Sequence, residues 1–232
     1  SDGQIKPDMS SVGVSAMIQT NANTIGFSNG TSFACPNMAG LGTCLWQGFP
    51  EFNNMRIIRE LQKASSKFST PDDRVGYGIP NMKLAFSNLL VDYATSSSTI
   101  ANCNVIISWS SKDIAAMKYE VERKGPAESV YTKVGTINPQ AGTTLTNRNY
   151  QFINDVTGLT TGNYSYRIRQ IIDTAATSFT AIYIDTTNVN SPTNCVIVIP
   201  PEPFKELITV QPNPVSNKNL TLIVETPFPI NN

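Results

Sequence analysis

The sequence of 232 residues contains no histidine, and this absence limits the chemistry that the chain can perform alone. A hydrolase that uses a serine–histidine–aspartate triad needs an imidazole to accept and return the proton. Without histidine, the four cysteines (Cys35, Cys44, Cys103 and Cys195) cannot form a cysteine–histidine zinc site. We therefore expect no complete triad of this kind, no zinc site and no other cofactor within these residues.

Charged residues and long apolar runs are also scarce. Lys and Arg number 17, Asp and Glu number 17, and charged residues are 15% of the chain, so the formal net charge is zero. Without a basic excess or a basic run, we expect no nucleic-acid partner. No stretch approaches the roughly 18 consecutive apolar residues of a membrane-spanning helix, so we expect no transmembrane segment. A surface built from Ser, Thr, Asn and Gln favours a secreted or cell-surface protein.

The most informative stretch surrounds Ser32. From Phe33 to Trp46 almost every residue is apolar or small, which predicts a fully buried helix with Ser32 at its N-terminus. The first N–H groups of a helix have no internal partner, so they can stabilise a developing oxyanion. We predict that Ser32 is a nucleophile and that its own backbone N–H is an oxyanion donor.

Neighbouring residues fit this role for Ser32. Gly30 allows a tight turn and a close approach of substrate, and Thr31 is a candidate N-cap. Pro36 falls near the first turn and leaves the Ser32 carbonyl without its usual helical bond. Glycines at 40 and 42 predict close packing, since each costs roughly 1 kcal/mol in a helix interior. The alternative is an ordinary core helix capped by a Gly-Thr-Ser turn.

The longer pattern Gly-Thr-Ser-x-Ala-x-Pro-x-x-Ala-Gly at residues 30–40 resembles the serine motif of the subtilisin-like serine proteases, peptidase family S8. Residues 1–8, Ser-Asp-Gly-Gln-Ile-Lys-Pro-Asp, resemble the strand ahead of this motif, at about the family's usual distance. Gly-Tyr-Gly at 76–78 is similar to the end of the protease domain, so the resemblance reaches to about residue 90. Residues 11–13, Ser-Val-Gly, depart from the family's Ala-Pro-Gly.

This resemblance implies a function. In the family the catalytic Asp and His lie upstream of the serine, and an upstream asparagine side chain is the second oxyanion donor. The resemblance therefore implies a fragment of a secreted serine endopeptidase that cleaves protein or peptide substrates through Ser32 and is inactive alone. Calcium is common in the family, but no acidic loop here demands it. The alternative is a non-catalytic protease-like protein that serves in surface adhesion or as a scaffold.

Local patterns predict the elements around the serine motif. We expect a strand start at residues 4–8, extended chain at 12–19 and a polar loop at 21–29. A second helix begins after Asn53, with Glu60 among its outward-facing residues. A third helix begins near Pro80, because proline is favoured in the first turn.

Two pairs of residues have side chains that can bind metals, but we expect a structural role for both pairs. Cys35 and Cys44 lie on different faces of the predicted buried helix, so we expect both to fill core space. Asp72 and Asp73 follow a proline in a loop, and we expect them to be solvated carboxylates rather than metal ligands.

The hydrophobic period changes after the serine- and threonine-rich run at 95–99, which predicts a linker. Alternation at Val105, Ile107 and Trp109, repeated in later segments, predicts an antiparallel β-sandwich. The segment from 159 to 168 resembles part of a fibronectin type III-like domain, and this resemblance makes Tyr164 the tyrosine-corner residue. Aromatic residues on a carbohydrate-binding face are the alternative.

The two remaining cysteines, Cys103 and Cys195, lie near the ends of this second domain. A disulfide between them is one expectation for an exported protein, but spacing alone does not fix the pairing.

The end of the chain is rich in proline. Pro-Pro-Glu-Pro at 200–203 predicts a stiff linker. Pro-Asn-Pro at 212–214, after a short strand, is similar to the start of the C-terminal sorting domain of type IX secretion cargo. This similarity implies the type IX machinery as a partner and export across the outer membrane.

The fold class that we expect is multidomain. The C-terminal part of an α/β subtilisin-like fold occupies 1–92, an all-β antiparallel sandwich occupies 93–199, and a truncated β tail occupies 200–232.

Overall fold

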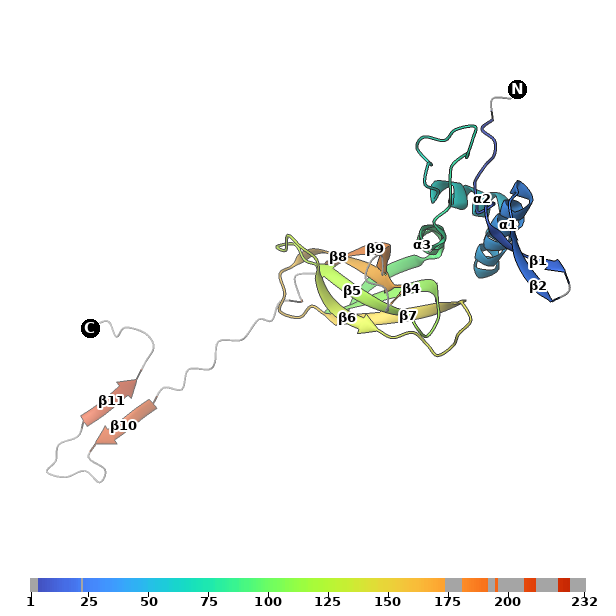
Figure 1. Cartoon of the computed structure of the whole chain (residues 1–232). Helices are drawn as coiled ribbons and strands as arrows, with labels where there is room; N and C mark the ends of the chain where they lie inside the picture. The colour runs from blue at the N-terminus through green and yellow to red at the C-terminus, as the bar shows by residue number, and fades with distance from the viewer. Residues whose placement is uncertain are drawn as a thin grey trace. The chain divides into compact units, whose positions relative to one another are not determined.

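Figure 1 shows a computed structural model of the chain, coloured from the N-terminus to the C-terminus. It describes residues 4–21, 23–173, 181–191 and 195, and the backbone of two further strands at 207–211 and 221–225. The chain divides into two compact units, Ser1–Cys195 and Val196–Asn232, which are described separately below. The domain boundaries predicted at 92/93 and 199/200 stay predictions.

The first unit begins with a β-hairpin and three helices. Strand β1 (Ala16–Asn21) pairs antiparallel with β2 (Thr24–Ser28). Helices α1 (Thr31–Gly48), α2 (Asn54–Lys63) and α3 (Met82–Tyr93) follow. The predicted cap of α2 is confirmed, because the Asn53 side chain accepts a hydrogen bond from the backbone N–H of Arg56 at 2.9 Å. Asn81 caps α3 in the same way. The helices share a core formed by Leu45, Phe49, Ile57, Leu61, Ala64, Ala85, Leu89 and Leu90.

Two predictions for this region are wrong. Residues 4–8 form no strand, and most of the predicted loop at 21–29 is the second strand of the hairpin. Asn23 has a φ of 73°, in the left-handed region that asparagine tolerates, so the chain can reverse there and pair with itself.

The prediction that Glu60 faces outward is also wrong, because only 1% of this residue is exposed to solvent. Its carboxylate lies 3.3 Å from Arg56 Nε and 2.7 Å from Lys63 Nζ. A carboxylate can be buried when cations of its own helix pair with it. Periodicity predicted that Glu60 would face outward, but its carboxylate is buried and paired with two cations.

Seven antiparallel strands complete the first unit in two sheets. One sheet has the order β3-β4-β7, formed by β3 (Thr95–Ala101), β4 (Asn104–Asp113) and β7 (Thr146–Asp155). The other has the order β6-β5-β8-β9, formed by β6 (Thr132–Ile137), β5 (Lys118–Lys124), β8 (Gly162–Ile171) and β9 (Ala181–Ser191). Val105, Ile107 and Trp109 alternate inward as predicted, and both sheets contribute to one buried core.

The predicted linker at 95–99 is wrong, because these residues belong to β3. A two-residue turn, Asn102 and Cys103, joins β3 to β4 with φ angles of 48° and 61°. Positive φ at both central residues is the geometry that matches the twist of a hairpin. The backbone of a serine-rich segment can pair with a neighbouring strand as well as any other backbone. Composition alone therefore led to the wrong assignment of residues 95–99 as a linker.

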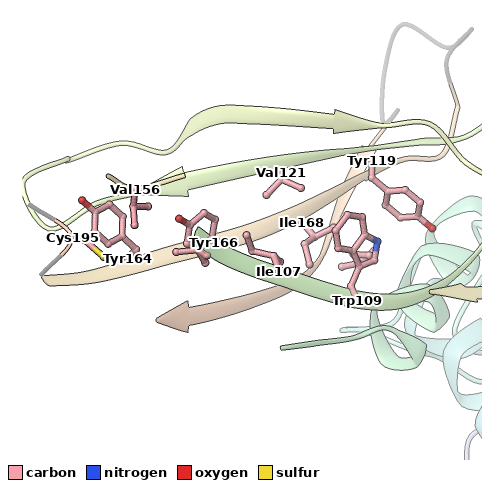
Figure 2. Packing of buried hydrophobic residues seen from close by; sticks show 11 residues of the cluster. Ile107, Trp109, Tyr119, Val121, Val156, Tyr164, Tyr166, Ile168 and Cys195 are labelled. Atoms are coloured by element: carbon pink, nitrogen blue, oxygen red, sulfur yellow. The ribbon is translucent and has the colours of Figure 1, made fainter. Parts of the chain in front are cut away.

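Aromatic residues fill the core between the two sheets (Figure 2). Trp109, Tyr119, Tyr164 and Tyr166 are each no more than 3% exposed, so the carbohydrate-face alternative is wrong for them. The Tyr164 hydroxyl donates to the Thr160 carbonyl at 2.5 Å, which confirms the predicted tyrosine-corner bond.

The disulfide that the sequence left open is present. Cys103 and Cys195 are bonded, with their Cα atoms 5.2 Å apart. The bond ties the β3–β4 turn to the end of the unit, across 92 residues of sequence. A disulfide that closes a long loop constrains the unfolded chain more strongly than one that closes a short loop.

Lys112 of β4 connects the sandwich to the helices. Its side chain is 5% exposed, and its ammonium group donates to the Gly48 carbonyl and the Glu51 carboxylate at 2.7 Å each. The same ammonium lies 5.3 Å from the ring centroid of Phe49 and 5.0 Å from that of Tyr93. Burial acts to raise the pKa of Glu51, but the hydrogen bond from Lys112 holds that pKa below its ordinary value.

The second unit contains an antiparallel pair of strands, β10 (Leu207–Gln211) and β11 (Thr221–Glu225). The proline segments at 200–203 and 212–214 lie outside the described residues. Among the described helices of both units, none has the length and apolar character needed to cross a bilayer.

Replacing Lys112 with methionine should lower the free energy of unfolding by about 2 kcal/mol, because hydrogen bonds from a buried charged donor are lost. Urea unfolding followed by circular dichroism measures this change. The control is Lys133→Met, which removes an ion pair of a side chain that is 56% exposed. That substitution should change stability by less than about 0.5 kcal/mol. Equal effects of the two substitutions would contradict the assigned role of Lys112.

Candidate active site

Ser32 is the second residue of α1, and its side chain is exposed. Gly30 occupies the N-cap position and Thr31 is the first helical residue, so the predicted N-cap role of Thr31 is wrong. No side chain caps the helix, and its first turn holds no acidic residue. A threonine one position too late cannot reach the N–H groups that a capping oxygen would accept from.

The first turn of α1 leaves backbone donors open. The Phe33 N–H donates to the Gly30 carbonyl at 3.1 Å. Within the described residues, no group accepts a hydrogen bond from the N–H of Thr31 or Ser32. Open N–H groups and the helix dipole both favour negative charge at this point. The arrangement is suited to an oxyanion, and the catalytic roles assigned to Ser32 stay predictions.

Pro36 lies further into α1 than its pattern predicted. It is the sixth residue of the helix, beyond the first turn, so its missing N–H removes a bond that an interior residue would make to the Ser32 carbonyl. The Ser32 carbonyl is therefore free of its helical partner, as predicted. The cost of placing proline there is larger than at a first-turn position.

An extended segment holds the loop that leads to Ser32. The Gly30 N–H donates to the Gly13 carbonyl at 2.7 Å, and the Ser15 N–H donates to Asn29 Oδ1 at 2.7 Å. Asn37 Nδ2 also donates to the Val12 carbonyl at 3.3 Å. These three bonds fix the approach to the helix from its N-terminal side.

Gly13 is the site residue that sequence reasoning missed. A Cβ atom at this position would lie 2.9 Å from the Gly30 carbonyl oxygen, closer than real Cβ atoms come. A lone glycine in an extended stretch was the available signal, since it often marks a close backbone approach. By contrast, Gly30 is extended, with a φ of 162°, and its Cβ would meet the Phe33 ring at an ordinary 3.5 Å. The conformation and the space at Gly30 therefore do not by themselves require glycine.

Most of α1 is exposed, which corrects the prediction of a fully buried helix. Leu45 is the buried residue of α1, while Cys35 and Cys44 are exposed free thiols rather than core filler. A Cβ at Gly42 would lie 3.6 Å from Leu61, but one at Gly40 would meet nothing within 4 Å. The described residues cover α1 along one side only, so close packing exists at Gly42 and is absent at Gly40.

An apolar groove lies beside α1, and its lining includes the two residues that precede Ser32. Its volume is about 910 Å³, and the N-terminal segment, α1 and α2 contribute its walls. Gly30, Thr31 and Trp46 are among the residues that line it.

Asp72 lies in the loop between α2 and α3. Among the residues that the structure describes, no three His, Cys, Asp or Glu side chains gather as a metal site. The hydrogen bond from Lys67, with those from the backbone of Val75 and Arg74, lowers the pKa of Asp72 to about 2. Asp72 is thus a carboxylate that organises its own loop.

Comparison with known proteins gives one family. Residues 1–78 match the family model described as the subtilase family, Peptidase S8. This match supports a subtilisin-like fragment within the chain and a serine peptidase at the family level. No curated protein matches the chain.

Two solved structures show a weak likeness to the chain. The first is pectate lyase Pel3 from Pectobacterium carotovorum, with 13% identity and a TM-score of 0.30, covering 51% of this chain and 30% of that one. The second is a penta-heme cytochrome c552 from Thermochromatium tepidum, with 6% identity and a TM-score of 0.29, covering 59% of this chain and 50% of that one. The chain therefore spans half or less of either structure.

Two glycine substitutions should shift stability in opposite directions. Gly13→Ala should lower the free energy of unfolding by about 2 kcal/mol, since its Cβ forces the Gly30 loop to move. Gly40→Ala should raise it by up to about 1 kcal/mol, since alanine is the better helix former and has open space there. Thermal and urea unfolding measure both changes. A stabilising Gly13→Ala would overturn the close contact with Gly30.

Proposed function

We propose that this chain carries the nucleophile-bearing part of a secreted subtilisin-like serine endopeptidase. The observation that supports it best is the exposed Ser32 beside open backbone N–H groups at the start of α1. The subtilase match over residues 1–78 includes this serine. The substrate class is protein or peptide.

The proposed reaction begins when Ser32 Oγ attacks the scissile carbonyl carbon. As the new C–O bond forms, the hydroxyl proton passes to an imidazole that a carboxylate orients. The carbonyl oxygen becomes an oxyanion, which accepts a hydrogen bond from the Ser32 N–H and, by family resemblance, from an asparagine side chain. Collapse breaks the C–N bond, the imidazolium protonates the leaving amine, and water then hydrolyses the acyl-enzyme.

Three of these groups lie outside the 232 residues under this proposal. The chain has no histidine, so the imidazole must come from elsewhere in the full-length protein, with the orienting aspartate and the asparagine. The chain alone is therefore inactive. The alternative is a protease-like protein that has lost the upstream His or Asp and serves in surface adhesion or as a scaffold.

A fluorophosphonate probe separates these two functions, since it labels only an activated serine. Full-length protein from the complete reading frame should be labelled at Ser32, whereas the 232-residue chain should not. Ser32→Ala should abolish labelling, and Ser69→Ala, at an exposed loop serine, should leave it unchanged. Folded full-length protein that resists the probe, or a reading frame that encodes no Asp and His blocks, would favour the scaffold.

We also propose that the sandwich is fibronectin type III-like and that the chain is exported by the type IX route. Seven antiparallel strands in sheets of three and four, and the Tyr164 corner, support the first part. The Cys103–Cys195 disulfide supports export, because such bonds persist in oxidising compartments. The Pro-Asn-Pro at 212–214 supports the sorting route.

Alkylation of the protein in its native source tests the export proposal. Under non-reducing conditions Cys35 and Cys44 should be modified, while Cys103 and Cys195 should be protected until a reductant is added. Mass spectrometry of the peptides reads all four positions in one sample. Rapid alkylation of Cys103 and Cys195 in freshly lysed cells would place the protein in a reducing compartment and contradict export.

A further inference from the structure

In the described part of the chain, the two sheets of the sandwich have four edge strands, and three of them carry features that hinder pairing with another chain. Strands β3 and β9 are held to each other, because the Ser98 hydroxyl donates to the Asn188 carbonyl at 2.9 Å. Strand β6 has six residues, includes Lys133, and pairs with β5 in a register that shifts between Val121 and Glu122. A bond to another edge, short length, lysine and an irregular register each keep an edge strand from pairing further.

The fourth edge strand, β7, has none of these features. It is ten residues long, contains no proline or lysine, and pairs with β4 along its whole length without a shift in register. Every second residue of such a strand directs its backbone N–H and C=O away from the neighbouring strand. Among the described residues, no backbone group bonds to this side of β7 (Figure 1). The edge is therefore a template for one more strand.

The charges of β7 do not oppose such pairing. The exposed face of the strand carries four uncharged side chains, those of Asn147, Asn149, Gln151 and Ile153. Of the two charged residues, Arg148 donates from its guanidinium to buried Asp113 Oδ1 at 3.1 Å. The carboxylate of the other, Asp155, accepts from the Thr157 N–H at 2.8 Å. Each charge already has a partner within its own chain, so the edge neither repels nor selects a strongly charged strand.

A second copy of β7 fits this edge. In a two-fold antiparallel pair of strands, opposed residues lie on the same face of the joined sheet, so one residue lies opposite itself. With Gln151 at that position, Tyr150 lies opposite Phe152 of the second copy, and Arg148 and Asp155 each lie opposite an asparagine. Aromatic pairs across strands stabilise a sheet, and no like charges oppose each other in this register. The strand is therefore complementary to itself.

We infer that β7 is a homodimer interface, in which it pairs antiparallel with β7 of a second copy and Gln151 lies on the two-fold axis. The sheets β3-β4-β7 of the two copies then form one continuous sheet, and neither copy keeps an open edge at β7. This inference goes beyond the proposed peptidase and does not depend on it, because Ser32 takes no part in the pairing.

A charge at position 151 tests the interface. Gln151→Lys places two ammonium groups opposite each other, so in sedimentation of the 232-residue chain it should raise the dimer dissociation constant at least about 10-fold. The matched control is Ser97→Lys, because Ser97 is exposed on the same face of the sheet and pairs with Ser108, which pairs with Gln151. The control should keep the dissociation constant within about twofold of wild type. Circular dichroism checks that both variants are folded.

A disulfide tests the register. In a chain with Cys35→Ser and Cys44→Ser, which removes the two free thiols, Gln151→Cys should form a covalent dimer under mild oxidation. Opposed residues of an antiparallel pair bring their Cβ atoms to about 4.5–5.5 Å, close to the distance that a disulfide spans. Ser97→Cys should stay monomeric on the same non-reducing gel, because β3 lies two strands away from the interface.

Three outcomes would overturn the inference. The first is a wild-type chain that sediments as a monomer at high micromolar concentration. The second is a dimer that Gln151→Lys leaves intact, since another surface would then form it. The third is Gln151→Cys that cross-links no faster than Ser97→Cys. Fluorophosphonate labelling of Ser32 in the full-length protein is read separately, so the dimer and the peptidase can each fail without the other.

Discussion

The buried ammonium group of Lys112 is the contact on which the arrangement of the first unit depends. An ammonium leaves water at tolerable cost only when charged and polar partners replace its hydration. Those partners are the Gly48 carbonyl at the end of α1 and the Glu51 carboxylate, so β4 has to stay against the C-terminus of the serine-bearing helix. A cation at this end also suits the helix dipole. The sandwich is thereby joined to α1 by contacts, beyond the covalent connection.

The sequence correctly predicted those elements that depend on interactions between residues close together in the chain. Alternation at Val105, Ile107 and Trp109 reflects a strand with one buried face, and the Asn53 cap acts within one helical turn. The strand at 95–101 was missed because its serines and threonines were interpreted as a linker, although it pairs with β4 in a local hairpin. The hydrogen bond between the Ser98 and Thr187 hydroxyls, which also holds this strand, is tertiary and carries no local signal. Glu60 was misassigned because its burial requires the paired cations of Arg56 and Lys63, which periodicity does not weigh.

The candidate site also contains features that local sequence predicts and features that it does not. The position of Ser32 at a helix start could be predicted, since Gly-Thr-Ser precedes a long apolar run. The exact N-cap residue could not be predicted, because the end of a helix can shift by one residue and the hydrogen bonds of the cap decide its position. Gly13 could not be assigned to the site, because its partner Gly30 is distant in sequence and the contact exists only in the fold.

The exposure of α1 conflicts with its composition, and the conflict is informative. Proline costs about 3 kcal/mol and each glycine about 1 kcal/mol in a helix interior, and α1 contains Pro36, Gly40 and Gly42. A helix of such low propensity persists only where packing on its faces offsets that cost. The described residues bury Leu45 and leave open space beside Gly40. The composition of α1 therefore favours more burial than the described residues provide.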